Sequence, residues 1–255
     1  MPYTGAVELN DVKLPMTGSR NSVDRGRRWV DHYGLAMVDD GHWVSWHRAY
    51  EDPNSSISRR LAAVQRRLGQ AMDAAPAGPI RLVSMCAGQG RDVIGVLAVH
   101  ARREDVKARL VELDPALVDD ARTLAIHSGL LDLEFCQDDA STTAAYIDAV
   151  PADIVLVCGV FGNITDSDVR RTVDELPGLV APGATVIWTR HRLDPDLTPS
   201  IRSWFSQNGF EEVGFDTEEG SFFGVGTHRF VGTPRTFEPG RMLFNFRGDG
   251  SGARL

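Results

Sequence analysis

The chain has 255 residues, 42% hydrophobic and 24% charged, proportions that favour a globular protein over a disordered or coiled-coil one. Its 35 acidic residues outnumber its 27 basic ones, and the net charge of −8 argues against a dedicated nucleic-acid surface. The three cysteines form neither a disulfide framework nor a zinc-ligand pattern, and no signal peptide or membrane-spanning apolar run stands out, so we expect a cytoplasmic protein without membrane partners.

The first 78 residues differ in composition from the rest of the chain. Residues 1–23 lack hydrophobic periodicity and predict a flexible arm, whereas residues 24–78 are rich in Trp, His and Arg and predict a helical lobe. Within this lobe, residues 55–58 predict a turn and cap before a helix over 59–72. The aromatic and histidine side chains of residues 42–50 are candidates for a substrate-binding lid: Trp43, Trp46, His47 and Tyr50. The alternative is a helix that packs its aromatic face on the following domain.

From residue 79 to residue 247, apolar runs typical of buried strands alternate with amphipathic helical patterns. The runs expected to form parallel strands are 81–85, 108–113, 131–136, 153–158 and 184–189. Two further runs, 210–215 and 222–230, are joined by a short glycine-containing link and predict an antiparallel hairpin. The expected fold is therefore α/β, with a seven-stranded, mostly parallel sheet, a C-terminal antiparallel hairpin and helices on both faces. The glycine-rich residues 248–255 predict a disordered tail.

The helical patterns also predict where the helices lie. The apolar stripe after the first strand runs from Val93 to Ala101, and the next helix carries Pro115 in its first turn. A later stripe runs from Val169 to Val180, and the helix that carries it is expected to end at Pro182-Gly183.

Candidate ligand-binding residues follow four of the expected strands. The first is a glycine-rich turn, where the backbone can approach a ligand closely, with the sequence Cys86-Ala87-Gly88-Gln89-Gly90-Arg91-Asp92. The next three strands are followed by acidic or small residues: Glu112 and Leu113, then Asp138, Asp139 and Ala140, then Gly159, Val160, Phe161, Gly162 and Asn163. A carboxylate after the second strand can accept hydrogen bonds from a ribose diol, and one after the third can meet an adenine amine. Each acid alone is more typical of a solvated surface, but together they favour one site at the carboxyl ends of the strands.

At these residues the chain resembles the class I S-adenosylmethionine-dependent methyltransferases. The matching stretches are CAGQGRD, VELDPALVDDA, Asp138-Asp139-Ala140, ADIVLVCGVFGNI and LVAPGATVIW, within about residues 79–230. The resemblance implies a Rossmann-like fold, S-adenosylmethionine as cofactor and S-adenosylhomocysteine as product. It implies that Gly88 and Gly90 flank the methionine part, that Glu112 holds the ribose and that Asp139 with Ala140 meets the adenine. It also implies that Gly159 and Val160 line the methyl-transfer face.

The chain departs from the family pattern at two positions. Ser84 stands where the family usually has an acidic residue near the end of the first strand, and Cys86 replaces the first glycine of its GxGxG turn. The dinucleotide fingerprint GxGxxG fits less well, because Val93 stands where its third small residue should be. A non-catalytic module that binds the cofactor, and less strongly an NAD(P)-dependent oxidoreductase, are the alternatives.

The acceptor of the methyl group is expected to be a small molecule. His191 follows the fifth strand and is the candidate general base, although it can equally bridge a loop between arginines. Arg190, Phe161 and Asn163 are candidate acceptor contacts, and an ordinary surface role for the arginine is about as strong an interpretation. The turn CGVFGN lacks the Asn/Asp-Pro-Pro-aromatic motif of enzymes that methylate base amines or glutamine amides. No dense acidic cluster predicts a metal, so we expect none.

Overall fold

The computed structural model of this chain describes residues 29–30, 36–37, 55–217 and 222–246. The predicted arm, the predicted tail and the aromatic segment 42–50 lie outside these ranges, so their structure stays a prediction. The chain divides into two units, residues 1–43 and 44–255. In the first unit, β1 (Trp29–Val30) and β2 (Ala36–Met37) pair in antiparallel orientation.

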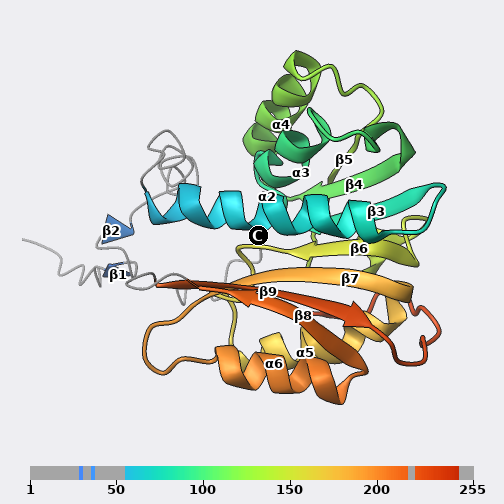
Figure 1. Cartoon of the computed structure of the whole chain (residues 1–255). Helices are drawn as coiled ribbons and strands as arrows, with labels where there is room; N and C mark the ends of the chain where they lie inside the picture. Colours follow the sequence, from blue (N-terminus) through green and yellow to red (C-terminus); the bar gives the residue numbers. More distant parts are fainter. Residues whose placement is uncertain (1–28, 31–35, 38–54, 218–221, 247–255) are drawn as a thin grey trace, which may run out of the picture. The chain divides into compact units, whose positions relative to one another are not determined.

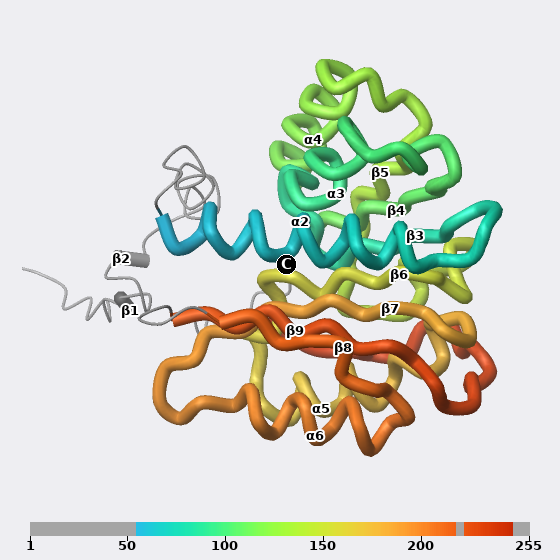
Figure 2. Tube along the Cα trace, in the orientation of Figure 1, coloured from blue at the N-terminus to red at the C-terminus, as the bar shows by residue number. Residues whose placement is uncertain are grey.

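The second unit is built on a seven-stranded sheet with the order β5-β4-β3-β6-β7-β9-β8 (Figure 1 and Figure 2). Its strands are β3 (Ile80–Met85), β4 (Val106–Glu112), β5 (Glu134–Gln137), β6 (Ala152–Val157), β7 (Val180–His191), β8 (Phe210–Asp216) and β9 (Phe223–Phe230). The strands from β3 to β7 pair in parallel, whereas β9 runs antiparallel to both β7 and β8. The predicted sheet and its terminal hairpin are therefore confirmed, and the hairpin folds back so that its second strand pairs with β7.

Helices cover both faces of this sheet (Figure 1). They are α2 (Ser56–Ala74), α3 (Arg91–Leu97), α4 (Pro115–His127), α5 (Asp166–Glu175) and α6 (Thr198–Gln207). Helices α2, α3 and α4 lie on one face and α5 and α6 on the other, because each places its apolar side chains against a different set of strand residues. Among the described helices, none is both long and apolar enough to cross a bilayer.

Helix α2 is part of this layered arrangement. The Ser55 hydroxyl accepts a hydrogen bond from the Ser58 backbone N–H, which is the predicted helix cap, although the helix begins at Ser56. Val64 and Leu68 are buried and pack with residues of α3, β3 and β9. The described end of the predicted lobe therefore covers the sheet that follows it in sequence.

Several elements end elsewhere than predicted. Helix α3 stops at Leu97 and leaves Ala101 exposed, and β5 begins at Glu134 with Leu131 78% exposed before it. Helix α5 ends at Glu175, because Pro177 follows in a 3-10 turn over Leu176–Gly178 and has no N–H to continue the helix. Val180 then begins strand β7, so Pro182-Gly183 lies inside a strand and not at a helix end.

A segment after β9 returns along α5 to the ends of two strands. Leu243 and Phe244 are fully buried, and the Leu243 N–H donates to the Ser141 carbonyl at 2.7 Å. Single bridges join Thr142 to Met242 and Ile164 to Phe246. This return segment braces the loops that follow β5 and β6, and nothing in its sequence pattern predicts it.

Candidate functional site

The turn after β3 has a backbone shape that glycine favours. Three residues have left-handed φ angles, Cys86 at 51°, Gly88 at 55° and Gly90 at 65°. The turn is fixed to the next strand because the Ala87 N–H donates to the Val111 carbonyl at 2.9 Å. Gly90 caps α3, and an ideal Cβ there would lie 2.7 Å from Leu110 Cδ2, so its small size serves helix-to-strand packing as well.

Glu112, at the end of β4, holds this turn and its own loop together. Its Oε2 accepts a hydrogen bond from the Gly88 N–H at 2.8 Å, and its Oε1 accepts from the N–H groups of Leu113 and Asp114 at 2.8 and 3.0 Å. Gln89 points elsewhere, because its side-chain amide donates to Asp120 of α4. Glu112 is thus joined to Gly88, as a shared site requires.

The loop after β5 meets the same two elements. The Asp138 N–H donates to the Glu112 carbonyl at 3.1 Å, and Asp139 follows directly. Burial raises the pKa of the Cys86 thiol well above its usual value, and the negative charges of Glu112 and Asp139 add to that rise. Both carboxylates therefore act on the thiol electrostatically. The residues that follow β3, β4 and β5 thus lie close to one another.

Backbone N–H groups donate to the carboxylates of Glu112, Asp138 and Asp139 at this edge. In the part of the chain that the structure describes, Glu112, Asp138 and Asp139 form no ion pair. Carboxylates without an ion pair can accept hydrogen bonds from a ligand. The ribose diol, the adenine amine and the ammonium group of an adenosyl cofactor are such donors. The residues present therefore fit an adenosyl cofactor.

A side chain of the neighbouring strand β7 holds the turn after β6. The Gly159 N–H donates to Thr189 Oγ1 at 2.9 Å, and the Asn163 side-chain amide donates to the Gly159 carbonyl at 2.6 Å. Gly159 has a φ of 77°, and an ideal Cβ there would meet nothing within 4 Å. Space is therefore available beside Gly159, as the expected methyl-transfer face needs.

The expected role of Phe161 in this turn as an acceptor contact needs correction. Phe161 is fully buried and packs on Trp188 with ring centroids 5.9 Å apart, so its side chain belongs to the core and does not reach an acceptor. Val160 is also fully buried, and its place at the methyl-transfer face stays a prediction. Ala140 is buried too, and its carbonyl accepts a hydrogen bond from the Tyr146 hydroxyl at 2.6 Å. Apolar side chains in these loops anchor them to the sheet.

His191 and Arg190, at the end of β7, lie beside the β6 turn. An ideal Cβ on Gly162 would lie 3.5 Å from His191 Cδ2, which places the imidazole next to that turn. The Arg190 guanidinium donates to the Phe161 carbonyl and pairs with Asp166 at 3.4 Å, and the side chain is 5% exposed. Arg190 thus braces the turn, and its contact with an acceptor stays a prediction.

Thr189 is a site residue that the sequence pattern does not single out. Its hydroxyl positions Gly159, yet a threonine inside a strand is unremarkable by sequence. The candidate acceptor residues Trp43, Trp46, His47 and Tyr50 lie outside the described residues. Among the described residues, no group of three or more His, Cys, Asp or Glu is placed to hold a metal ion.

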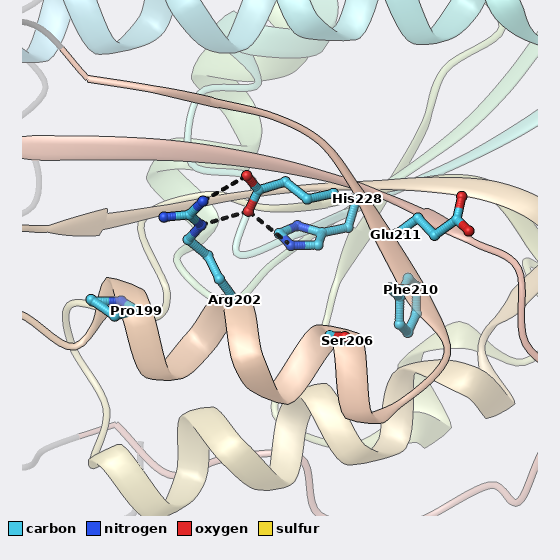
Figure 3. Close-up of a pocket in the computed structure, with 7 residues that line it drawn as sticks. Pro199, Arg202, Ser206, Phe210, Glu211 and His228 are labelled. Carbon is cyan, nitrogen blue, oxygen red and sulfur yellow. Dashed lines mark hydrogen bonds and ion pairs between the residues drawn. The ribbon is translucent and has the colours of Figure 1, made fainter.

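A cavity of about 670 Å³ lies away from this edge, between α6 and strands β8 and β9 (Figure 3). Its lining residues are Pro199, Arg202, Ser206, Phe210, Glu211, Glu212 and His228. The Glu212 carboxylate lies 2.5 Å from the Arg202 guanidinium and 3.7 Å from His228 Nε2, and dashed lines in Figure 3 mark these contacts. None of the predicted site residues lines it.

Comparisons with known proteins agree with this geometry. A family model described as "Putative methyltransferase" matches residues 54–211. No curated protein sequence matches. Magnesium protoporphyrin IX methyltransferase (ChlM) from Synechocystis PCC 6803 with bound SAM is similar in structure, with a TM-score of 0.60 and 13% identity over 75% of this chain and 92% of that one.

Two further solved structures share the fold. The [4+2]-cyclase SpnF has a TM-score of 0.53 and 14% identity over 71% of this chain and 86% of that one. A structure described as a possible exported protein from Bordetella parapertussis has a TM-score of 0.55 and 16% identity over 74% of this chain and 79% of that one. At these identities the likeness shows the fold, whereas the family match covers more than half of the chain. The chain therefore belongs to the methyltransferase family, with the fold of the class I S-adenosylmethionine-dependent enzymes.

Proposed function

We propose that this protein binds S-adenosylmethionine and transfers its methyl group to a small-molecule acceptor, leaving S-adenosylhomocysteine. One observation carries the cofactor part of the proposal. The Gly88 N–H donates a hydrogen bond to the Glu112 carboxylate, and the charges of Glu112 and Asp139 both raise the pKa of the Cys86 thiol. The ends of β3, β4 and β5 therefore form one cluster. The family match supports the transfer part.

The residues at this cluster have separate tasks in the proposal. Glu112 retains acceptor capacity for the ribose diol while it fixes Gly88 and the loop after β4. Asp138, Asp139 and the backbone of Ala140 face the adenine. The backbone of Cys86, Ala87 and Gly88 leaves room for the methionine part.

A bound S-adenosylmethionine supplies a methyl group on a positively charged sulfur, open to in-line attack. The protein's contribution is alignment of the acceptor and, where the acceptor must lose a proton, a base. His191 is the described imidazole beside the β6 turn, and in this proposal it takes that proton. The open space at Gly159 receives the acceptor atom.

Ligand binding and turnover test the two parts separately. S-adenosylhomocysteine should raise the melting temperature of the purified protein, whereas NAD and NADP should not. A panel of small acceptors with isotopically labelled S-adenosylmethionine should then yield labelled product. Stabilisation by a dinucleotide alone would contradict the proposal at its first step.

A second candidate function is cofactor binding without methyl transfer. Two features favour it: the Phe161 side chain is buried in the core, and the Arg190 guanidinium is engaged by the turn itself. The similar structure SpnF is described as a [4+2]-cyclase, so this fold serves chemistry other than methyl transfer. Tight binding of S-adenosylhomocysteine without turnover of any acceptor would favour this candidate.

A further inference from the structure

The return segment holds the loop after β5, which carries the expected adenine contacts. The Leu243 N–H donates to the Ser141 carbonyl at 2.7 Å, and the Thr143 N–H donates to the Arg241 carbonyl at 2.9 Å. Arg241 follows Thr143 by 98 residues in the sequence. The loop is therefore attached to a distant part of the chain that lies beside it only in the folded protein.

The Thr143 side chain adds two hydrogen bonds to this attachment. The residue is 3% exposed. Its hydroxyl donates to the Glu238 carbonyl at 2.6 Å and accepts from the Arg241 N–H at 2.9 Å. A hydroxyl can do both, whereas a valine side chain of similar shape can do neither. Removal of this hydroxyl therefore leaves two backbone groups of the return segment without their partner.

The attached backbone also carries the Asp139 carboxylate. Asp139 Oδ1 accepts a hydrogen bond from the Ser141 N–H at 2.9 Å, and the return segment holds the carbonyl of that same serine. The hydroxyl of the fully buried Tyr146 donates to the Ala140 carbonyl at 2.6 Å. Three residues that follow Asp139 are thus held by hydrogen bonds, the last of them Thr143.

The return segment is itself fixed to α5, the helix that follows the β6 turn. Arg171 Nε and the Thr172 hydroxyl both donate to the Leu243 carbonyl at 3.1 Å. The Arg241 guanidinium donates to the two Glu175 oxygens at 2.6 and 3.0 Å. Because the segment is bonded to a helix of the domain, it can hold the loop after β5 in one position.

We propose that Thr143 is a positioning residue for adenine recognition, because its hydroxyl fastens the loop that carries Asp139 to the return segment. Asp139 accepts a hydrogen bond from the adenine amine, and Thr143 acts through the loop and not by contact with the cofactor. A polar contact discriminates between ligands only when its own supports hold it in place. This inference rests on the proposed function, because it assumes that the adenine binds at this loop.

Two ligands that differ at the base test the assignment. S-inosylhomocysteine has a carbonyl oxygen where S-adenosylhomocysteine has its adenine amine. In calorimetric titrations the wild-type protein should prefer S-adenosylhomocysteine by about 10- to 100-fold, because a carboxylate accepts from an amine and repels a carbonyl oxygen. Thr143→Val should lower this preference by about threefold or more, whereas Thr143→Ser, which keeps the hydroxyl, should change it by less than about twofold. Thr123→Val, the same change at an exposed threonine of α4, should also leave it unchanged.

The outcomes separate this inference from the proposed function. If the wild-type protein binds neither ligand, the proposed function fails and the inference fails with it. If it binds both equally, cofactor binding stands but the amine is not recognised, and the inference is overturned. A purely structural role of Thr143 would weaken both ligands by the same factor in Thr143→Val, and this unchanged preference would also overturn the inference, as would a loss of preference in Thr143→Ser. Should Thr143→Val fail to fold, Thr143→Ala removes the same hydroxyl with a smaller side chain and allows the same comparison.

Discussion

The cavity between α6 and β8 and the carboxyl edge of the sheet differ in how their carboxylates are partnered. Cationic side chains pair with the carboxylate at the cavity, whereas backbone N–H groups donate to those at the edge. At the cavity, Arg202 bonds both oxygens of Glu212 at 2.5 and 2.8 Å, and Glu212 Oε2 lies 3.7 Å from His228 Nε2. The other ring nitrogen of His228 accepts from Trp188 Nε1 at 3.1 Å. At the carboxyl edge, by contrast, Glu112 and Asp139 lie near the Cys86 thiol, and their hydrogen-bond donors are backbone N–H groups.

The cavity residues form an ion-pair network whose charges satisfy one another, whereas the carboxyl edge has the features expected of the proposed binding site. Ion pairs that satisfy each other can stabilise a fold but leave little capacity for a ligand. Carboxylates held near each other by backbone donors keep negative charge for a donor-rich, positively charged ligand. The α6–β8 cavity is thus less informative about function than the charge balance at the sheet edge.

The largest expected effect comes from filling the turn after β3. Gly88→Val should abolish measurable S-adenosylhomocysteine binding, because a β-branched residue tolerates the φ of 55° poorly and would occupy the space for the ligand. Gly129→Val is the matched control, since Gly129 has a φ of 68° with open space around it at the end of α4. Calorimetry on both variants, with circular dichroism for folding, checks the prediction. Retained affinity in Gly88→Val would contradict the proposed turn.

The cavity network should respond to pH through stability. Burial lowers the pKa of His228 from 6.5 to about 4 in the folded state. The unfolded state takes up this proton as the pH falls through 6.5, whereas the folded state resists it, so about 3 kcal/mol of stability is lost between pH 6.5 and 4.

A non-titrating variant isolates this effect of His228. Urea unfolding at pH 7.5 and 5 should show a smaller loss of stability in His228→Gln than in the wild type, because glutamine can accept from Trp188 without taking up a proton. Equal losses in both proteins would mean that other groups determine the pH dependence.

Glu112 should have a smaller effect, confined to the carboxyl edge. Glu112→Gln removes the negative charge and replaces one accepting oxygen with an NH₂ group, which cannot accept a hydrogen bond from the backbone N–H groups. S-adenosylhomocysteine binding should therefore weaken by about 1–3 kcal/mol. Calorimetric dissociation constants test this, with Glu104→Gln as a surface control. Unchanged affinity would remove Glu112 from the ribose site.

The smallest effect is expected at Cys86. Cys86→Gly restores the residue that the family has there and relieves a left-handed φ of 51°, but it loses a buried thiol. These two contributions oppose each other, so the free energy of unfolding should change by less than about 1 kcal/mol and the cofactor affinity by less than about twofold. A large loss of affinity would show that the thiol itself contacts the ligand.

The sequence predicted the sheet and the turn motifs well because both depend on local pattern. Alternating apolar runs and helical stripes specify parallel strands with crossovers, and glycines or acids at strand ends mark the ligand edge. It predicted helix ends less well, since a continuing apolar stripe across Leu176 and Val180 hides the change from helix to strand. The sequence was also misleading in the loops, because Phe161 was a candidate acceptor contact and is instead buried in the core.

By itself the sequence determined the fold class, the order of the strands along the chain and the residues at the ends of four of them. Only the tertiary structure decided which of these residues meet. Glu112 reaches Gly88, Arg190 holds the β6 turn, and the Gly159 N–H donates to Thr189 near the end of β7. Such pairings depend on the register of neighbouring strands and on how helices pack across them, and neither is written in the local spacing of residues.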